Sequence, residues 1–182
     1  MPNLAVASTF TDSFNIAGSG ITGSGTLTLT TTGTPGVDEI TGITGTFSTS
    51  NNGGFSGTIT GLNPGSYSSS NPTVNPISTY DNLFYPTDAT ATCVGTVTSE
   101  PLDDCGLDFV VNNEYQVNVW GNGGGTYALS DALLSAAGGY IDDNAPVTFT
   151  AAATPEPSAF VLLGTGLLGM AGTLRRRFPK RC

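Results

Sequence analysis

Short segments that alternate apolar and polar residues run through most of this chain, separated by Gly, Asn and Pro. Such alternation places one face of a strand in a core and leaves the other face in solvent. No run of helical period stands out between residues 8 and 154, so we predict an all-β region there. The segments that show the pattern most clearly are residues 10–16, 25–31, 43–49, 55–62, 91–98, 107–111, 115–120 and 147–151.

The spacing of these segments favours one kind of all-β architecture. Strands that recur every ~8–12 residues are typical of an antiparallel β-sandwich or jelly roll, and we predict that fold for one domain of residues 8–154. Residues 63–79 are predicted as a long surface loop, and residues 130–137 as one short helix capped by Ser130 or Asp131. The predicted tight turns, where Asn and Gly accept a positive φ, are at Asn52-Gly53, Asn63-Pro64-Gly65 and Asn122-Gly123.

Alternation also predicts which side chains face the core in two of the strands. Each strand is expected to bury one face, as a two-sheet core requires. The predicted buried sets are Leu107, Phe109 and Val111 in one strand and Tyr115, Val117 and Val119 in the other. The opposite face of the second strand carries Gln116, Asn118 and Trp120.

The distribution of charge excludes several functions. All 14 acidic residues lie within residues 1–174, the five Lys and Arg lie at or beyond residue 175, and His is absent. A nucleic-acid binder needs cations to release phosphate counterions, so this class is excluded. Schiff-base chemistry, imidazole metal sites and His-dependent hydrolytic triads are excluded too. We expect no catalytic residue and no enzyme; a glycosidase with two facing carboxylates is a minor alternative, because no spacing singles out a pair.

An uncharged apolar run at residues 159–174 precedes a basic tail at residues 175–182, which begins with Arg175, Arg176 and Arg177. As a helix the run is about 24 Å long. It spans a bilayer core of about 30 Å if the arginines snorkel. Positive charge on one flank keeps that flank in the cytoplasm. We predict a single transmembrane helix that leaves residues 1–158 outside; a buried core helix is the alternative.

This C-terminal segment resembles the PEP-CTERM sorting signal in its three parts and in their order. Pro155, Glu156 and Pro157 precede the apolar run, and the arginine triplet follows it. The resemblance implies that a membrane-embedded exosortase recognises the three residues and cleaves near them. It also implies delivery to the cell surface or to an exopolysaccharide matrix of a Gram-negative bacterium. Residues 155–182 are therefore predicted as a sorting signal, with the proline-glutamate-proline motif as substrate residues.

The body of the chain has a looser likeness. It resembles other uncharacterised PEP-CTERM proteins, which implies a β-sandwich but no activity. The segments that carry the likeness are Tyr80-Asp81-Asn82-Leu83-Phe84-Tyr85-Pro86, Leu107-Asp108-Phe109 and Val117-Asn118-Val119-Trp120.

An exported domain requires a signal peptide, and residues 1–7 have neither a basic region nor an apolar stretch. Ala5-Val6-Ala7 has the small-x-small form of a cleavage site. We interpret residues 1–7 as the remnant of a signal peptide whose start codon was assigned too late. The alternative is that residues 4–6 begin the first strand.

The three cysteines divide between two redox environments. Cys93 and Cys105 lie on the exported side, where thiols are oxidised, whereas Cys182 follows the predicted span. We expect a disulfide between Cys93 and Cys105, and a loop of this size is stabilised by about 3 kcal/mol in the chain-entropy relation. Two free buried thiols are the alternative.

Two acidic clusters offer the oxygen ligands that Ca²⁺ prefers, although neither has EF-hand spacing. Calcium is the only cofactor that these clusters suggest, and solvated acidic turns are the alternative interpretation. The weak calcium candidates are Asp103, Asp104 and Asp108 in one cluster and Asp142 and Asp143 in the other.

Two further patterns bear on binding. Exposed aromatic rings stack on sugars, which favours a glycan-binding module unless the rings simply cover the core. Thr26, Thr28 and Thr30 place three hydroxyls on one strand face, the array that ice-binding surfaces use, but one strand is a small platform. The aromatic candidates are Tyr80, Tyr85, Trp120 and Tyr127.

The sequence as a whole predicts an exported surface or extracellular-matrix protein with a structural or interaction role. Its expected partners are an exosortase, the membrane before processing, and extracellular polysaccharide. A glycan-binding module is the alternative function, ahead of an ice-binding protein or a glycosidase.

Overall fold

The computed structural model describes residues 7–63, 67–68, 79–86, 98–99, 101–134 and 140–153. The chain divides into two compact units, Met1–Ala152 and Ala153–Cys182. Within the described residues no helix has the length and apolar character needed to cross a membrane. The predicted transmembrane run at 159–174 lies outside these residues, as do residues 1–6, most of the predicted loop and most of the predicted strand at 91–98.

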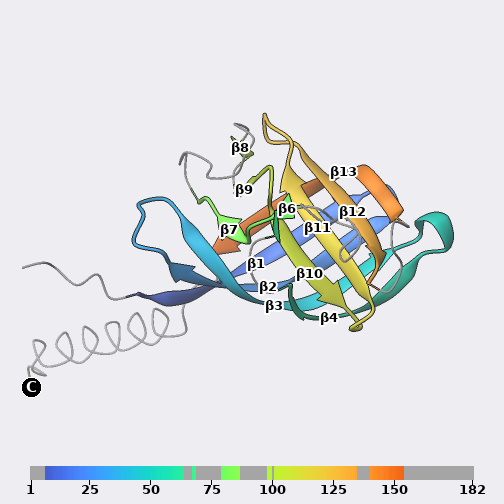
Figure 1. The fold of residues 1–182 in the computed structure, drawn as a ribbon, viewed down its shortest axis with the longest axis horizontal. Coiled ribbons are helices and arrows are strands. Elements are labelled where there is room, and N and C mark those ends of the chain that lie inside the picture. Colours follow the sequence, from blue (N-terminus) through green and yellow to red (C-terminus); the bar gives the residue numbers. More distant parts are fainter. Residues whose placement is uncertain are drawn as a thin grey trace, which may run out of the picture. The chain divides into compact units, whose positions relative to one another are not determined.

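The first unit is built almost entirely from strands (Figure 1). The main sheet contains β1 (Thr9–Gly18), β2 (Ile21–Thr31), β3 (Asp38–Thr49), β4 (Phe55–Leu62), β10 (Leu107–Val111), β11 (Tyr115–Gly121), β12 (Tyr127–Leu133) and β13 (Tyr140–Ala153). The shorter elements are the 3₁₀-helix η1 (Asn51–Gly53) and the strands β5 (Tyr67–Ser68), β6 (Thr79–Tyr80), β7 (Leu83–Phe84), β8 (Thr98–Ser99) and β9 (Leu102–Asp103).

The main sheet closes on itself into a barrel of eight strands. Its order is β2-β1-β13-β12-β11-β10-β4-β3, with β7 added beside β3, and an antiparallel pairing of β2 with β3 completes the circle. The predicted all-β class is confirmed, but the predicted two-sheet sandwich is wrong. The physical difference is in the edges: β2 is paired along both sides, so closure removes the free edges that a sandwich keeps.

A pair of glycines brings two barrel strands unusually close together. Gly25 of β2 and Gly45 of β3 lie directly opposite each other. A Cβ on Gly25 would collide with the carbonyl oxygen of Thr44, and a Cβ on Gly45 with that of Ser24. Gly45 also has a φ of 150°. Glycines of this kind let a strand bend sharply, as barrel closure requires.

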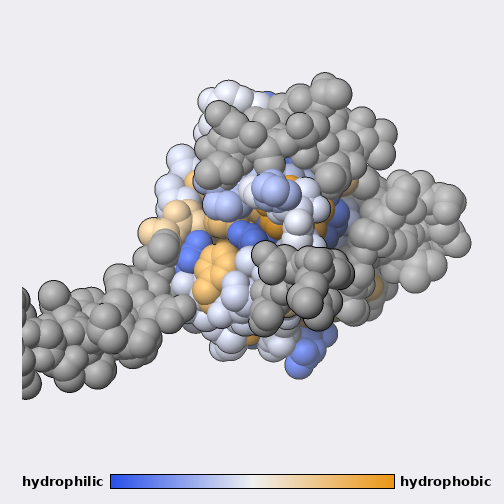
Figure 2. Space-filling model, turned by 90° about the vertical axis from the view of Figure 1, so that its left-hand side faces the viewer, coloured by the Kyte–Doolittle hydropathy of each residue, from blue (hydrophilic) through white to orange (hydrophobic). Residues whose placement is uncertain are grey.

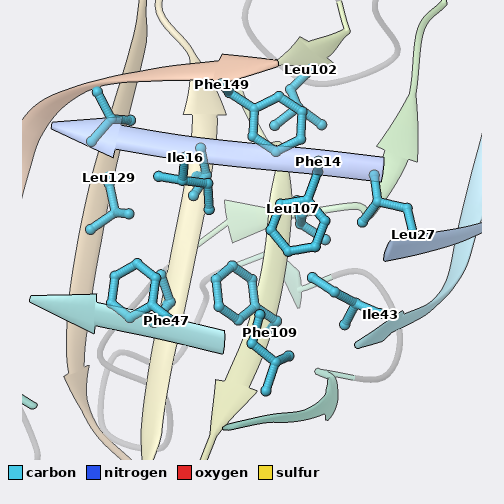
Figure 3. Packing of buried hydrophobic residues seen from close by; sticks show 14 of the residues in the cluster. Phe14, Ile16, Leu27, Ile43, Phe47, Leu102, Leu107, Phe109, Leu129 and Phe149 are labelled. Carbon is cyan, nitrogen blue, oxygen red and sulfur yellow. The ribbon is translucent and has the colours of Figure 1, made fainter. Parts of the chain in front are cut away.

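Apolar side chains fill the barrel, as an interior formed by eight strands permits. Figure 3 shows rings and branched side chains from β1, β3, β10, β12 and β13 pointing toward one another across it. Phe14 stacks on Phe149 with 6.3 Å between ring centroids, and Phe47 meets Phe109 edge-on at 5.8 Å. The buried sets predicted for residues 107–111 and 115–119 lie in or against this core.

The strand predictions were accurate where alternation was regular. Residues 55–62 and 107–111 match β4 and β10. The predicted helix at 130–137 is wrong in its described part, because residues 130–133 belong to β12, and β12 pairs with β11 over its full seven residues. Tertiary pairing with the neighbouring strand overrides the local capping signal of Ser130 and Asp131.

Two of the predicted tight turns are confirmed. Asn52 and Gly53 adopt positive φ values of 46° and 93° in the turn between β3 and β4. Gly123 has a φ of 82° in the turn between β11 and β12. The third signal lies only partly within the described residues, since Pro64 and Gly65 are outside them.

Candidate functional site

The barrel has two outer faces of opposite character. The outer face of β1–β4, called here the exposed wall, consists mostly of Ser and Thr that contact solvent. The outer face of β10–β12, called the covered wall, is buried although several of its side chains are polar. Gln116 and Asn118, predicted to lie on the face opposite the core, have exposed fractions of only 0% and 2%.

Residues 79–86 and 101–106, called the covering segment, pack against the covered wall. In Figure 1, β9 lies beside β11, and β7 lies between β9 and β3. Asn118 on β11 donates hydrogen bonds to the carbonyl oxygens of Cys105 and Leu107 at 3.2 and 3.4 Å. Nδ2 of Asn82 in the covering segment donates to the carbonyl oxygen of Asn63, the residue that follows β4, at 3.0 Å. Side-chain amides therefore attach this segment to the barrel.

Asp108 lies at the centre of the covered wall, and amide groups surround it. Its carboxylate accepts hydrogen bonds from Nδ2 of Asn63 at 2.7 Å and from Nε2 of Gln116 at 2.8 Å. Its backbone N–H donates to Oδ1 of Asn82 at 2.8 Å. Burial raises the pKa of Asp108 to about 7, although the two amide hydrogen bonds lower it. The Asp108 carboxyl thus links β10 to β11 and to the residue that follows β4.

A second acidic group lies within the covering segment itself. One ligand atom from each of Asp81, Asp103 and Cys105 lies within 4.8 Å of the others. Asp103 is fully buried and accepts hydrogen bonds from the Tyr85 hydroxyl at 3.0 Å and from the N–H groups of Cys105 and Gly106 at 3.1 and 3.0 Å. Burial, followed by the charge of Asp103, raises the pKa of Asp81 to about 7.

Cys105 is disulfide-bonded, so its sulfur is engaged in a covalent bond rather than available as a thiolate ligand. Its partner lies outside the described residues, and the pairing with Cys93 stays a prediction. The remaining pair of carboxyls, Asp81 and Asp103, has too few oxygen ligands to hold Ca²⁺ without further donors.

The structure separates the residues grouped as calcium candidates. Asp103 accepts a hydrogen bond from the Cys105 N–H within the covering segment, whereas Asp108 accepts from Asn63 and Gln116. The other cluster is divided as well, because Asp142 and Asp143 have different hydrogen-bond partners. The described contacts of Asp103, Asp108 and Asp142 are to protein donors, and calcium binding stays a prediction. The sequence pattern did not identify Asp81, Asn82, Gln116 and Asp131 as site residues. Each meets its partner only where separate segments of the chain come together.

Three of the four aromatic candidates for sugar stacking are buried. Tyr80, Tyr85 and Tyr127 have exposed fractions of 4%, 0% and 5%, and only Trp120 is half-exposed. Tyr127 packs against Phe149 in the core, with 5.8 Å between ring centroids. The prediction that these rings form a stacking surface is therefore wrong for the three tyrosines, since all three are buried.

A shallow groove of about 550 Å³ crosses the exposed wall. Cross-strand pairing aligns its side chains in rows, such as Asn15, Ser24, Thr46 and Thr58 from β1 to β4. Every polar side chain that lines the groove is an uncharged hydroxyl or amide, and the polar lining residues are Asn15, Thr22, Ser24, Thr46, Ser48, Ser56 and Thr58. Such a surface presents hydrogen-bond donors and acceptors without charge.

The surface seen in Figure 2 is mostly of intermediate hydropathy in its described part, with strongly hydrophilic and hydrophobic residues in small separate patches. Hydroxyl side chains of the exposed wall also contact one another. Oγ1 of Thr30 lies 3.4 Å from that of Thr9 and 3.3 Å from that of Thr41. The threonine array expected from one strand thus extends over several neighbouring strands.

The C-terminal residues supply the comparison with known proteins. Residues 153–177 match the family described as the PEP-CTERM protein-sorting motif. No curated protein and no solved structure matches the chain. The motif implies an exported protein that an exosortase processes, with a C-terminal membrane-anchored signal for the cell surface. Pro155, Glu156, Pro157 and the arginine triplet fall within this match but outside the described residues.

Proposed function

We propose that this chain, which carries a PEP-CTERM protein-sorting motif, is a structural or interaction component of the cell surface or extracellular matrix. One observation carries the proposal: the motif begins at residue 153, the last residue of β13. The sorting signal therefore follows the closed barrel directly. The barrel, once released, is the exported part of the protein.

The architecture supports a structural role. Closure of the sheet leaves β7 as an addition beside β3 rather than a long free edge, which limits uncontrolled pairing with other chains. The disulfide at Cys105 stabilises the covering segment outside the cell. The chain has no Lys, Arg or His before residue 175, so it lacks the usual groups that stabilise an oxyanion or activate a nucleophile. These features suit a durable, non-catalytic domain.

The sorting role is tested by replacing Pro155, Glu156 and Pro157 with Ala in the full chain. We expect the variant to stay at full length in the membrane fraction, because the exosortase no longer recognises it. A matched control carries Thr154→Ala and Ser158→Ala, which flank the motif. Immunoblots of membrane and released fractions measure both proteins. Normal trimming of the triple variant would contradict the proposal.

The groove on the exposed wall favours a second function, the binding of an uncharged polysaccharide. Sugar hydroxyls both donate and accept hydrogen bonds, as do the Ser and Thr side chains that line the groove. The rows of threonine also enlarge the platform considered for ice binding. However, the glycine pair Gly25 and Gly45 bends this wall, which suits a flexible polymer better than a flat crystal plane.

Polysaccharide binding is tested by retention of the full chain on immobilised neutral and acidic polysaccharides. Ser24→Glu places a charge in the groove and is expected to abolish retention on the neutral polymer. Thr28→Glu introduces the same charge on the same strand outside the groove lining, and is expected to keep it. Retention on acidic polymers is expected only with added Ca²⁺. Equal losses in both variants would argue against the groove.

A further inference from the structure

Two aspartates face each other inside one end of the barrel. Asp131 of β12 pairs with Asp142 of β13 between two register shifts, and it shares the inner face with Val117 directly across on β11. Their exposed fractions are 0% and 6%. Thr49, at the end of β3, lies beside them with an exposed fraction of 3%. Both carboxyls are thus removed from water, which opposes ionisation of the pair.

The hydrogen bonds of the two carboxyls differ in a way that assigns a proton. Asp142 accepts from the Thr49 hydroxyl at 2.7 Å through Oδ2 and from Nδ2 of Asn51 at 2.8 Å through Oδ1. Asp131 accepts from the backbone N–H of Asp142 at 2.9 Å through Oδ1, whereas its buried Oδ2 has no donor among the residues that the structure describes. A carboxylate needs donors on both oxygens when buried. Asp142 meets this need, and Asp131 does not.

The described part of the chain contains no Lys, Arg or His that could neutralise the pair, since Lys and Arg begin at residue 175 and His is absent. The titratable groups near this end on the neighbouring described elements are Glu114 and Tyr115, near the start of β11, and Tyr140 and Asp143 of β13. Tyr127 of β12 and Asp38 and Glu39 of β3 lie farther along their strands. Each is acidic or neutral, and Asp143 accepts from Ser130 on the opposite face of β12. A proton on Oδ2 of Asp131, directed at Asp142, satisfies the one unpaired oxygen.

We propose that Asp131 and Asp142 hold a single proton between them and that this proton keeps the end of the barrel closed. Loss of the proton leaves two buried carboxylates facing each other, and their repulsion separates β12 from β13 at this end. The barrel is then firmly closed in acidic to neutral surroundings and loosened in alkaline ones. The change falls near neutral pH, because burial and then the charge of Asp142 raise the pKa of Asp131 to about 7, although the hydrogen bond from the Asp142 N–H lowers it.

Hydrogen bonds connect the pair to parts of the barrel beyond β12 and β13. Asn51 of η1, which binds Asp142, also donates to the carbonyl oxygen of Ser19 in the turn between β1 and β2 at 3.2 Å. Asn52 of η1 donates to the carbonyl oxygen of Ile141 at 2.6 Å. The N–H of Ser50 donates to the carbonyl oxygen of Gly20 at 2.8 Å. Opening at the aspartates therefore releases two turns that close the barrel end.

The first experiment compares the thermal unfolding of the full chain in detergent at about pH 5 and about pH 8. Asp131→Asn keeps the shape of the side chain and supplies a permanent donor to Asp142, so its midpoint should fall clearly less between the two pH values than that of the natural chain. Asp143→Asn removes the same charge from the residue that follows Asp142. The midpoint of this control should fall as much as that of the natural chain. Equal falls in Asp131→Asn and Asp143→Asn would overturn the proposal.

The second experiment measures hydrogen exchange at the N–H groups of Ser50 and Asp142. In the natural chain their protection factors should drop about tenfold or more from pH 5 to pH 8, while core amides such as that of Phe109 change less. Asp131→Asn should remove this local drop. Two results would refute a shared proton: strong destabilisation by Asp131→Asn already at pH 5, and Asp131-dependent stabilisation of the natural chain by added Ca²⁺ at pH 8.

Discussion

The exposed wall and the covered wall have the same strand geometry but different surroundings. On β1–β4 the outward residues are mostly Ser, Thr and Asn, and solvent contacts them. On β10–β12 outward residues such as Asp108, Gln116 and Asn118 are buried, because further chain lies against them. A polar side chain at an outward strand position is thus compatible with either environment, and burial depends on what packs over the strand.

The difference changes what each polar group contributes. A hydroxyl of the exposed wall exchanges one hydrogen bond for another with water, so its net contribution is small. On the covered wall a lost partner leaves a buried donor or acceptor without compensation. Asn82 illustrates the second case, because it accepts from the N–H of Asp108 and donates to the carbonyl oxygen of Asn63.

The largest expected effect on unfolding free energy comes from a substitution on the inner side of the exposed wall. Gly25→Ala places a methyl group against the carbonyl oxygen of Thr44, and neither backbone can move without opening the barrel. We expect a loss of unfolding free energy at or above the upper end of the ~1–3 kcal/mol typical of overpacking. Gly42→Ala, whose Cβ would lie 3.3 Å from the Thr28 side chain, is the control and should change stability within about 0.5 kcal/mol. Urea unfolding measures both, and equal losses would contradict the close approach of the two strands.

A smaller effect is expected where the covering segment meets the covered wall. Asn82→Ala leaves the buried N–H of Asp108 without an acceptor and removes the donor to Asn63, which should cost about 1–3 kcal/mol. Thr44→Ala on the exposed wall is the control, and it should change stability within about 0.5 kcal/mol. Denaturant unfolding of both variants tests the comparison. Similar values would show that the two walls do not differ energetically.

The pH dependence of stability also distinguishes the walls. The raised pKa of Asp108, about 7, means that the folded state binds more protons than the unfolded state between about pH 4 and pH 7. Its contribution to stability is therefore greatest below this range and is lost as the pH rises to about 7. Asp108→Asn removes this titrating carboxyl and should flatten the slope. Oε1 of Gln116, which is buried without a partner among the described residues, accepts from the new amide after rotation.

Unfolding midpoints at several pH values between about pH 4 and pH 8 measure this slope. Glu39→Gln serves as the control, because Glu39 is an exposed carboxylate at the edge of the exposed wall. We expect its slope to match that of the natural chain. A slope that Asp108→Asn leaves unchanged would mean that Asp108 is ionised throughout the folded state.

The smallest expected effect on stability is at the groove. Thr26→Val preserves the shape of the side chain and removes one solvated hydroxyl, so the unfolding free energy should change by less than about 0.5 kcal/mol. The same replacement at Thr46, which lines the groove, should leave stability equally unchanged but weaken retention on neutral polysaccharide. Chromatographic retention compared with unfolding midpoints separates binding from folding. A large stability loss at either residue would mean that the exposed wall is not merely solvated.

Much of the barrel was predictable from local sequence. Alternation identified β4 and β10 with the bounds that the structure has, because each buries one regular face against the core. It failed at β12, where Ala128, Ser130 and Ala132 on the outer face are buried like the inner residues. A strand buried on both faces loses the period of two, and Ser130 then resembles a helix cap.

The candidate sites were less predictable. Sequence proximity grouped Asp142 with Asp143, but strand pairing joins Asp142 to Asp131 and separates it from its neighbour. The threonines of β2 were recognised, yet their partners on β1 and β3 follow only from the register. Contacts between residues distant in the chain decide both sites, and a local pattern contains no information about them.

The sequence by itself determined the sorting signal, the all-β class and the exclusion of cation-dependent chemistry. Each of these depends on residue type and short spacing alone: residues 153–177 are recognised as a linear motif, alternation indicates strands, and the lack of His and of any Lys or Arg before residue 175 holds in every conformation. Only the tertiary structure decided that the sheet closes, that the tyrosines are buried and that Asp131 faces Asp142. Closure and burial depend on long-range pairing, since a strand is stabilised by its neighbours rather than by its own hydrogen bonds.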